Sequence, residues 1–505
     1  MNKNKKIGFF LSLMMLIGSV VGIGIFFKNG GISRAVSGDG LSWLLAWIIG
    51  GIISITAALS FAEIGSFKNT KLTGLSNWAY KVGRARFGYF TATSYTLFYW
   101  GILATVLGLF FSEIFFQFLS TITTLNFKNI PIYVHIIVGF VIMLMFIVLN
   151  YLSTVVSGYL QSIVTIIKFI PLVFALFIGI LFPNTHNSDG MNAFLKNSFT
   201  IKGIIAALPF VLFSYDAFLV SGSLSHKTKN PSKTLPKVIL VGLVFVTILY
   251  TLIALSSIFH NAGFIGTLIA DSISVSAAKY VTPIIFFFLI ISTLGVINGI
   301  SSGFTNEIRN LINSNLLFGS TKLKNKFGYT KTTFIYMGII MTFWSLIIFI
   351  PSIILNSDIL IDGISNFTTV FFFSIYAIVI LLYTIKRNKF SETTKMNKYL
   401  YYITAITTII GITIIEIAFV VINIEFLSDL SKTNPAGWGL FLDNQSNKIP
   451  AYLPILLYVI FLFTFISLPF INYYLELKIN KRNLIKSFNE LVMFKTTRLK
   501  QKHRT

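Results

Sequence analysis

The stretch Gly18-Ser19-Val20-Val21-Gly22-Ile23-Gly24-Ile25-Phe26 lies in the middle of the first long apolar segment, residues 8–36. A glycine costs an α-helix about 1 kcal/mol relative to alanine, so Gly22 and Gly24 weaken the helix at this depth. Unwound backbone inside a membrane is tolerated where it is buried in protein or lines a cavity, and the positive end of a broken helix suits a carboxylate. We predict a break here. The alternative is that these glycines allow close helix packing.

A second interruption, Phe213-Ser214-Tyr215-Asp216-Ala217-Phe218, follows Pro209 in the apolar segment 203–224. Asp216 lies about ten residues from either end of this segment, and a carboxylate at such depth costs roughly 3 kcal/mol or more, which marks it as a functional candidate. The segment is the sixth apolar segment of the chain, five after the first interrupted one. Paired interruptions at matching positions of two halves indicate a transporter binding site. This pairing favours a site over simple packing.

The composition is that of a polytopic membrane protein. The 505 residues are 55% hydrophobic and 11% charged, with a mean hydropathy of +0.81, whereas a soluble protein carries roughly 25% charged residues. Apolar runs of about twenty residues recur from end to end, as transmembrane helices require. We predict an all-α integral membrane fold with twelve transmembrane helices, near residues 8–36, 42–66, 87–118, 131–149, 155–182, 203–224, 236–258, 281–312, 332–350, 360–384, 399–423 and 450–474.

The same composition excludes other classes of protein. A disordered chain, a secreted disulfide scaffold and a DNA-binding domain are all incompatible with it. The chain has no cysteine and five histidines, so it has no disulfide, thiolate metal site or cysteine nucleophile, and the histidines form no HExxH pair. We therefore predict no catalytic residue, no metal site, no cofactor and no nucleic-acid partner.

The net charge of +24 is mostly a signal of topology. One side of the predicted spans holds 31 of the 40 Lys and Arg residues. Positive loops stay in the cytoplasm, so both termini are expected inside: residues 1–7, with a first span too long for a signal peptide, and a basic tail, residues 475–505, attracted to anionic lipid by roughly 1 kcal/mol per charge. The acidic residues expected outside are Asp39, Asp189, Asp271, Asp358, Asp362, Glu425, Asp429 and Asp443.

Lys168, in the segment 155–182, is a third anomaly. It lies about 13 residues from either end of its span, ~20 Å by helical rise, so its side chain is too short to reach the interface. It must face a polar cavity, pair with an acid or lose its proton, which makes it a candidate proton carrier. The alternative is a static, structural ion pair.

Five other charged residues have simpler explanations. Glu63 closes the second span near the expected cytoplasmic boundary, where water or the basic loop that follows would solvate it. Glu113 and Glu416 lie near the outer ends of their spans, where solvation is again expected. Glu307 and Arg309 are two residues apart near the inner end of the eighth span and do not share a helix face, so each is expected to pair elsewhere.

Four motifs follow one another in a recognisable order. They are Gly22-Ile23-Gly24-Ile25-Phe26; Ala58-Leu59-Ser60-Phe61-Ala62-Glu63-Ile64-Gly65; Lys168-Phe169-Ile170-Pro171; and Phe213-Ser214-Tyr215-Asp216 followed by Lys229-Asn230-Pro231 and Pro236. In these motifs the chain resembles the amino acid–polyamine–organocation (APC) superfamily of permeases. The resemblance covers roughly residues 8–385, and the last two helices fit it by count alone.

The resemblance implies a LeuT-type fold. Two inverted five-helix repeats, residues 8–182 and 203–384, would be followed by two extra helices at 399–474 and would alternate access to a central site between the first and sixth helices. Backbone amides would hold the substrate α-carboxylate and backbone carbonyls its α-ammonium. The residues implied are Val21, Gly22, Ile23 and Gly24 for the carboxylate, and Phe213, Ser214 and Asp216 for the ammonium.

The resemblance also implies roles for several side chains. Phe213 resembles the family's aromatic gate, and Tyr215 and Phe218 are counted with it among the substrate-binding residues. Lys168 matches the fifth-helix lysine that, in proton-coupled members, occupies the place of a sodium ion in sodium-coupled relatives.

The chain departs from the family pattern in three places. Ile23 replaces a small or hydroxyl residue, so a side-chain contact to the carboxylate is lost. His226 and Lys227 stand where an acidic residue often precedes Lys-Asn-Pro, which puts a cytoplasmic gate salt bridge in doubt. Asp216 stands where many members have glycine. It could bind a cationic group or cap the second half-helix, and the cap is the preferred interpretation because aspartate is a favoured N-cap residue.

These observations predict a permease that carries amino acids across the cytoplasmic membrane, with proton coupling through Lys168 or with exchange. One alternative is a polyamine or cationic amino acid carrier that uses Asp216. Another is a sensor that keeps the fold without transporting. A membrane-embedded enzyme is disfavoured, because the sequence shows no paired catalytic carboxylates, histidine metal set or large extramembrane domain.

Overall fold

The computed structural model describes residues 8–490 except 69–71, 73, 125–126, 128–129, 153, 183–188, 197, 217, 220–228, 274, 432, 435–436 and 440–448. Its α-helices are α1 (Phe9–Val20), α2 (Ile23–Ala35), α3 (Gly40–Ile64), α4 (Gly74–Ser94), α5 (Gly101–Ile122), α6 (Ile132–Leu152), α7 (Thr154–Ile167), α8 (Phe169–Leu181), α9 (Ile201–Tyr215), α11 (Pro231–Phe259), α12 (Ile265–Asp271), α13 (Val275–Asn313), α14 (Ser320–Leu355), α15 (Ile359–Lys386), α16 (Lys398–Glu425) and α17 (Leu453–Asn480). The predictions for residues 1–7, for the end of the basic tail and for His226-Lys227 lie outside the described residues.

Ten helices of the described part are long and apolar enough to cross a membrane, which confirms a helical membrane fold. The predicted spans 8–36 and 203–224 are not among them. The first is divided into α1, with 12 residues, and α2, with 13; in the second, α9 has 15 residues. Because a crossing helix needs about 20 residues, none of these three pieces crosses alone.

Two predicted cytoplasmic loops contain helix. The loop predicted at 67–86 holds most of the first part of α4, and the loop predicted at 313–331 holds the start of α14. Each short helical piece is separated from its long span by a residue with left-handed backbone, Arg84 with φ 64° and Gly328 with φ 76°. Hydropathy missed both pieces because polar residues lower the local average: Asn77 and Lys81 in the first piece, and Lys322, Lys324 and Lys326 in the second. Lysine is nevertheless a good helix former.

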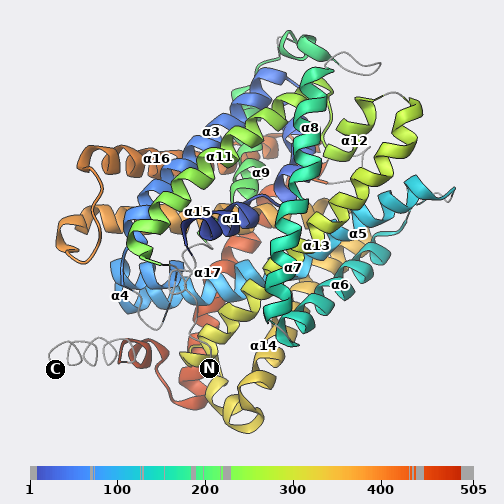
Figure 1. Ribbon diagram of the computed structural model, residues 1–505. Helices are drawn as coiled ribbons and strands as arrows, with labels where there is room; N and C mark the ends of the chain where they lie inside the picture. The colour runs from blue at the N-terminus through green and yellow to red at the C-terminus, as the bar shows by residue number, and fades with distance from the viewer. Residues whose placement is uncertain are drawn as a thin grey trace.

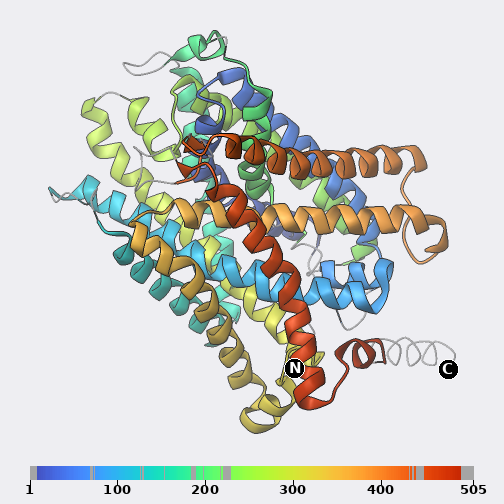
Figure 2. The same cartoon turned by 180° about the vertical axis from the view of Figure 1, so that it is seen from behind.

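The broken helices pack inside the bundle. Figure 1 shows α1 and α9 toward its middle, and α9 packs against α2, α3 and α15. Long helices surround them, with α3 along α11 and α5 along α6 and α13. The α5–α6 crossing is close, since a Cβ on Gly108 would lie 2.1 Å from the carbonyl oxygen of Gly139. Figure 2 shows α16 and α17 at the outside, where exposed apolar side chains such as Ile403 and Phe463 suit lipid.

A short ribbon joins α16 to α17 and is the one departure from an all-α fold in the described residues. Strand β1 (Thr433–Asn434) pairs antiparallel with β2 (Ile449–Pro450). Trp438, between the strands, packs on Phe367 of α15 with ring centroids 5.7 Å apart. A Cβ on Gly363 would lie 2.5 Å from the Trp438 ring, so a glycine is needed for this contact.

Candidate functional site

Both predicted interruptions are present as breaks in the backbone. Helix α1 ends at Val20, Val21 (φ −68°, ψ 102°) and Gly22 (φ −153°, ψ −150°) are extended, and α2 begins at Ile23. Helix α9 ends at Tyr215, and Asp216 (φ −62°, ψ 174°) is extended as well. Residues beyond a helix end leave backbone N–H and C=O groups without helical partners. The breaks therefore supply the polar backbone groups that the sequence predicted at these two places.

The two breaks lie against each other. A Cβ on Gly24 would lie 2.4 Å from Cα of Ser214 and 2.6 Å from its Oγ, so α2 and α9 meet at backbone-to-backbone distance. Two turns further along the same face of α2, a Cβ on Gly31 would lie 2.6 Å from the ring of Phe210. The glycines thus do allow close packing, as the alternative held, but the packing joins the two broken segments to each other. Both interpretations of the glycines apply.

The remaining predicted residues are mostly buried. Val21, Tyr215 and Phe218 are fully buried, and Phe213 is half-buried. The backbone of Ile23 opens α2, while its side chain lies outside the described residues. The carbonyl of Phe213 already accepts from the N–H of Asp216 at 3.3 Å, although a carbonyl oxygen can accept a second hydrogen bond.

Lys168 reaches the first break. Its Nζ donates to the carbonyl oxygens of Gly18 and Val21, and Tyr250 Oη donates to the carbonyl of Val20 at 3.1 Å. These carbonyls belong to the C-terminal end of α1, which carries the negative end of the helix dipole. The lysine is 2% exposed, and its hydrogen-bond partners are backbone carbonyls, which the three options from the sequence did not include.

Asp216 is held by hydroxyl groups. Its carboxylate accepts from Tyr99 at 2.6 Å, Thr369 at 3.2 Å and Tyr376 at 3.4 Å. Tyr99 lies in the π-helical segment Tyr95–Trp100 between α4 and α5, a geometry that is frequent at functional sites. The predicted N-cap role concerns the segment after Asp216, most of which lies outside the described residues. Sequence reasoning missed the three hydroxyl donors, which come from distant parts of the chain.

A buried ion pair beside the site was also missed. Lys28 Nζ lies 2.5 Å from Asp362 Oδ1 and donates to Ser365 Oγ at 2.9 Å, and both charged residues are 1% exposed. The ammonium is 4.3 Å from the centroid of the Phe213 ring. The sequence grouped Asp362 with the acidic residues of the outer side, and the structure buries it in the first turn of α15, which begins at Ile359. Lys28 lies within the predicted span 8–36, so the argument applied to Lys168 could have found it.

The same pair is tied to the segment that precedes α17. The N–H of Gly439 donates to Asp362 Oδ2 at 3.0 Å, and Arg34 Nη2 donates to the carbonyls of Gly437, at 2.9 Å, and Gly439. Helices α2 and α15 are thus joined through one loop and one ion pair, directly beside Phe213.

We expect Asp362→Asn to destabilise the protein, because it leaves the ammonium of Lys28 buried without its counter-charge. Removing one partner of a buried ion pair costs about 3–5 kcal/mol. Thermal unfolding of the purified protein in detergent measures this loss. Asp189→Asn is the matched control: its ion pair with Lys196 is about one-third exposed on each side, and such pairs are worth about 0–1 kcal/mol. Equal melting temperatures for the two variants would contradict the expectation.

Glu63 corrects another expectation. It is buried rather than solvated, and its carboxylate accepts from Arg387 Nε at 2.7 Å and Nη2 at 2.9 Å, from Tyr383 Oη at 2.8 Å and from the N–H of Met396 at 2.9 Å. The arrangement joins α3 to the end of α15. These partners follow Glu63 by more than 300 residues, so they do not belong to the neighbouring basic loop.

Glu113 is likewise buried rather than solvated as expected, whereas Glu416 is half-buried. Because α5 continues to Ile122, Glu113 is buried within the helix, 3.6 Å from His135 Nδ1. Glu416 accepts from Ser374 and, at 2.7 Å, from Tyr458. Within the residues that the structure describes, no group of three or more His, Asp or Glu side chains could hold a metal ion.

Comparisons with known proteins place this geometry in context. A family model described as amino acid permease matches residues 12–479. The serine/threonine exchanger SteT of Bacillus subtilis is 29% identical over 301 residues, covering 58% of this chain and 65% of that protein. The branched-chain amino acid permease BcaP of the same organism is 26% identical over 269 residues, covering 50% and 54%.

A mammalian relative is similar over the same part of the chain. The b(0,+)-type amino acid transporter 1 of Homo sapiens is 25% identical over 311 residues, covering 58% of this chain and 60% of that protein. The chain therefore spans less than two-thirds of the length of each of these three relatives. The matched family and these relatives are permeases, exchangers and transporters, not enzymes.

Proposed function

The chain belongs to the amino acid permease family, and we propose that it is a secondary transporter that carries amino acids across the cytoplasmic membrane by alternating access. The observation that carries the proposal is the contact between the two backbone breaks, at Gly24 and Ser214. The start of α2 offers N–H groups with the positive end of a helix dipole, and the end of α9 offers carbonyls. One zwitterionic α-amino acid matches both sets of groups.

The proposed cycle uses the predicted topology. Both termini lie in the cytoplasm, since basic residues gather on that side, and two inverted five-helix repeats move relative to each other. The Lys28–Asp362 pair and the loop bonded to Arg34 close the outer side above Phe213, so these contacts break when the site opens outward. Lys168 couples the cycle to protons, because its ammonium bonds the end of α1 and its loss of a proton weakens those bonds.

Neutral amino acids are the proposed substrates. Two relatives are named for serine and threonine and for branched-chain amino acids. A second candidate, a cationic amino acid or polyamine, is favoured by the buried carboxylate of Asp216, but three hydroxyl groups already donate to that carboxylate. A cationic ligand would have to replace some of these bonds.

Counterflow in proteoliposomes tests the function. Vesicles loaded with an unlabelled amino acid are expected to take up the same labelled amino acid faster than protein-free vesicles. A panel of serine, leucine, arginine and putrescine separates the candidates: exchange of serine or leucine supports the proposal, and exchange of arginine or putrescine alone supports the second candidate. Binding of any of them without counterflow would instead indicate a sensor that keeps the fold.

A further inference from the structure

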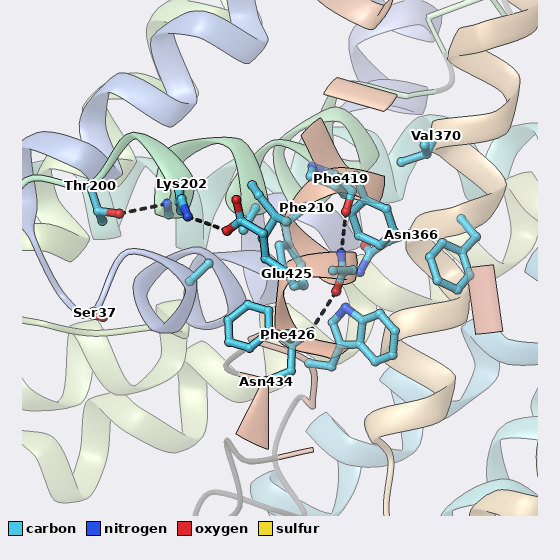
Figure 3. Close-up of a pocket in the computed structure, with 18 of the residues that line it drawn as sticks. Ser37, Thr200, Lys202, Phe210, Asn366, Val370, Phe419, Glu425, Phe426 and Asn434 are labelled. Atoms are coloured by element: carbon cyan, nitrogen blue, oxygen red, sulfur yellow. Dashed lines mark hydrogen bonds and ion pairs between the residues drawn. The ribbon is translucent and has the colours of Figure 1, made fainter. Parts of the chain in front are cut away.

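A cavity of about 480 Å³ lies between α2, α9, α15 and α16 (Figure 3). Its lining on α9 includes Pro209 and Phe210, about one and a half helical turns before the break at Tyr215. Its described lining residues include none of the residues predicted for the central site. The volume lies in the range of small-molecule sites, about 300–1,000 Å³. It is therefore a space of ligand size next to the breaks but separate from them.

The cavity has one buried polar group that needs a partner. Asn366 of α15 lines it and is 2% exposed, and among the described residues neither its Nδ2 nor its Oδ1 has a hydrogen-bond partner. A buried polar group without a partner is rare and costly, so each one calls for an explanation. Asn423 and Asn434, which also line the cavity, are bonded to each other at 2.8 Å. Asn366 is thus the lining amide available to a ligand.

The rest of the lining selects the chemistry of that ligand. Five aromatic rings contribute to it: Phe210, Phe367, Phe419, Phe426 and Trp438. The charged residues of the lining, Lys202 and Glu425, are paired with each other and mostly exposed, so they lie at the rim and leave no net charge inside. A ligand must then be net neutral, with a large apolar body and a donor and an acceptor close together.

We propose that this cavity is a second binding site for a net-neutral α-amino acid with a bulky apolar side chain. The ammonium donates to Oδ1 of Asn366, the carboxylate accepts from Nδ2, and the side chain packs on Phe367 and Trp438. This inference rests on the proposed function for its ligand class. The site lies at the end of the bundle where Lys202 and Glu425 meet water, which the charge distribution predicts to be outside.

Occupancy of this site affects the neighbouring closure. Asn366 follows Asp362 by one helical turn on α15, and Phe210 precedes Phe213 by nearly one turn on α9. Lys28 Nζ lies 5.7 Å from the centroid of Phe210 and 4.3 Å from that of Phe213. The cavity is also lined by Ala35 of α2. A bound amino acid therefore contacts α2 and α15, the two helices that the Lys28–Asp362 pair joins, and it stabilises the closed arrangement of the outer side.

Equilibrium binding of tritiated leucine and tryptophan to the purified full chain tests the inference. We expect two equivalents of at least one of these ligands per chain. Asn366→Leu removes the amide and keeps the shape, a change that is near neutral for stability when the amide is unpartnered. The substitution should weaken the binding of one of the two equivalents about tenfold or more, because it removes hydrogen bonds to the charged groups of the ligand. Ala206→Trp fills the cavity from α9 and should abolish the same equivalent, whereas the exposed control Asn192→Leu should change neither.

The outcomes also separate this inference from the proposed function. Wild-type stoichiometry and affinity in both Asn366→Leu and Ala206→Trp would overturn the second site. If the wild-type protein binds one equivalent and Gly24→Ala binds none, the second site is overturned and the proposed transport function still stands. Binding that depends on Asn366 in a protein without counterflow would support the second site and contradict the proposed function. An absence of binding of either amino acid would overturn the second site, and counterflow measured in parallel would then decide the function independently.

Discussion

We expect Gly24→Ala to reduce amino acid uptake by about 100-fold. The added Cβ would lie 2.4 Å from Cα of Ser214, whereas ordinary Cβ contacts lie at 3.4–4 Å. The obstacle is backbone, which cannot rotate away as a side chain can, so α2 and α9 must separate. In enzymes, a misplacement of about 1 Å can cost about 100-fold in rate, and we expect a loss of the same order in transport. The measurement is the initial rate of labelled uptake into proteoliposomes with equal amounts of folded protein.

Two further variants make this result specific to the contact. Gly338→Ala in α14 is the matched control, because a Cβ there meets nothing within 4 Å; uptake should equal that of the wild type. Ser214→Gly removes the Oγ and Cβ but leaves Cα in place, so it should not restore uptake in the Gly24→Ala background. Uptake at the wild-type rate in Gly24→Ala would show that the approach of the two breaks is unnecessary for transport.

The breaks could be predicted because their signals are local. Gly22 and Gly24 weaken a helix whatever surrounds them, and Asp216 at mid-span is costly in any membrane helix. The same reasoning identified Lys168, and the structure places it on the carbonyls of the first break. In each case the signal lay within a few residues of one apolar segment, and the pairing of the two interruptions favoured a site over simple packing.

Partners distant in sequence could not be predicted in this way. Lys28 and Asp362 are separated by 334 positions, and Glu63 and Arg387 by 324. A hydropathy profile predicts that an acidic residue near the end of a span is solvated, because the profile takes no account of a basic partner on another helix. The pairing depends on which helices become neighbours, and that is decided by tertiary packing.

The cap and the ligand roles of Asp216 illustrate a related limit. Both roles were drawn from the residues next to it, whereas its hydroxyl donors come from the π-helical segment before α5 and from α15. A π-helical turn has no clear sequence signature, so the hydrogen bond from Tyr99 to the carboxylate of Asp216 could not be predicted from the sequence. Local sequence thus located the two breaks, and packing determined what surrounds them.

Lys168→Met is expected to abolish the response of uptake to a pH gradient. Methionine approximates the length and volume of the lysine side chain, but it cannot donate to the carbonyls of Gly18 and Val21 or carry a proton. With an acidic exterior, the wild-type protein should accumulate labelled amino acid several-fold above equilibrium, and the variant should not exceed equilibrium. Lys322→Met, which replaces an exposed lysine of α14, should accumulate substrate as the wild type does.

Counterflow without a pH gradient then separates coupling from stability. If Lys168 acts in proton coupling, the variant should still exchange amino acid at a measurable rate, because the N–H groups of α2 and the carbonyls of α9 are unchanged. If the lysine acts as a structural support for the end of α1, counterflow and the melting temperature should fall together with accumulation. Full pH-driven accumulation in Lys168→Met would remove Lys168 from the coupling mechanism, and the carbonyl ends of α1 would then need another partner during transport.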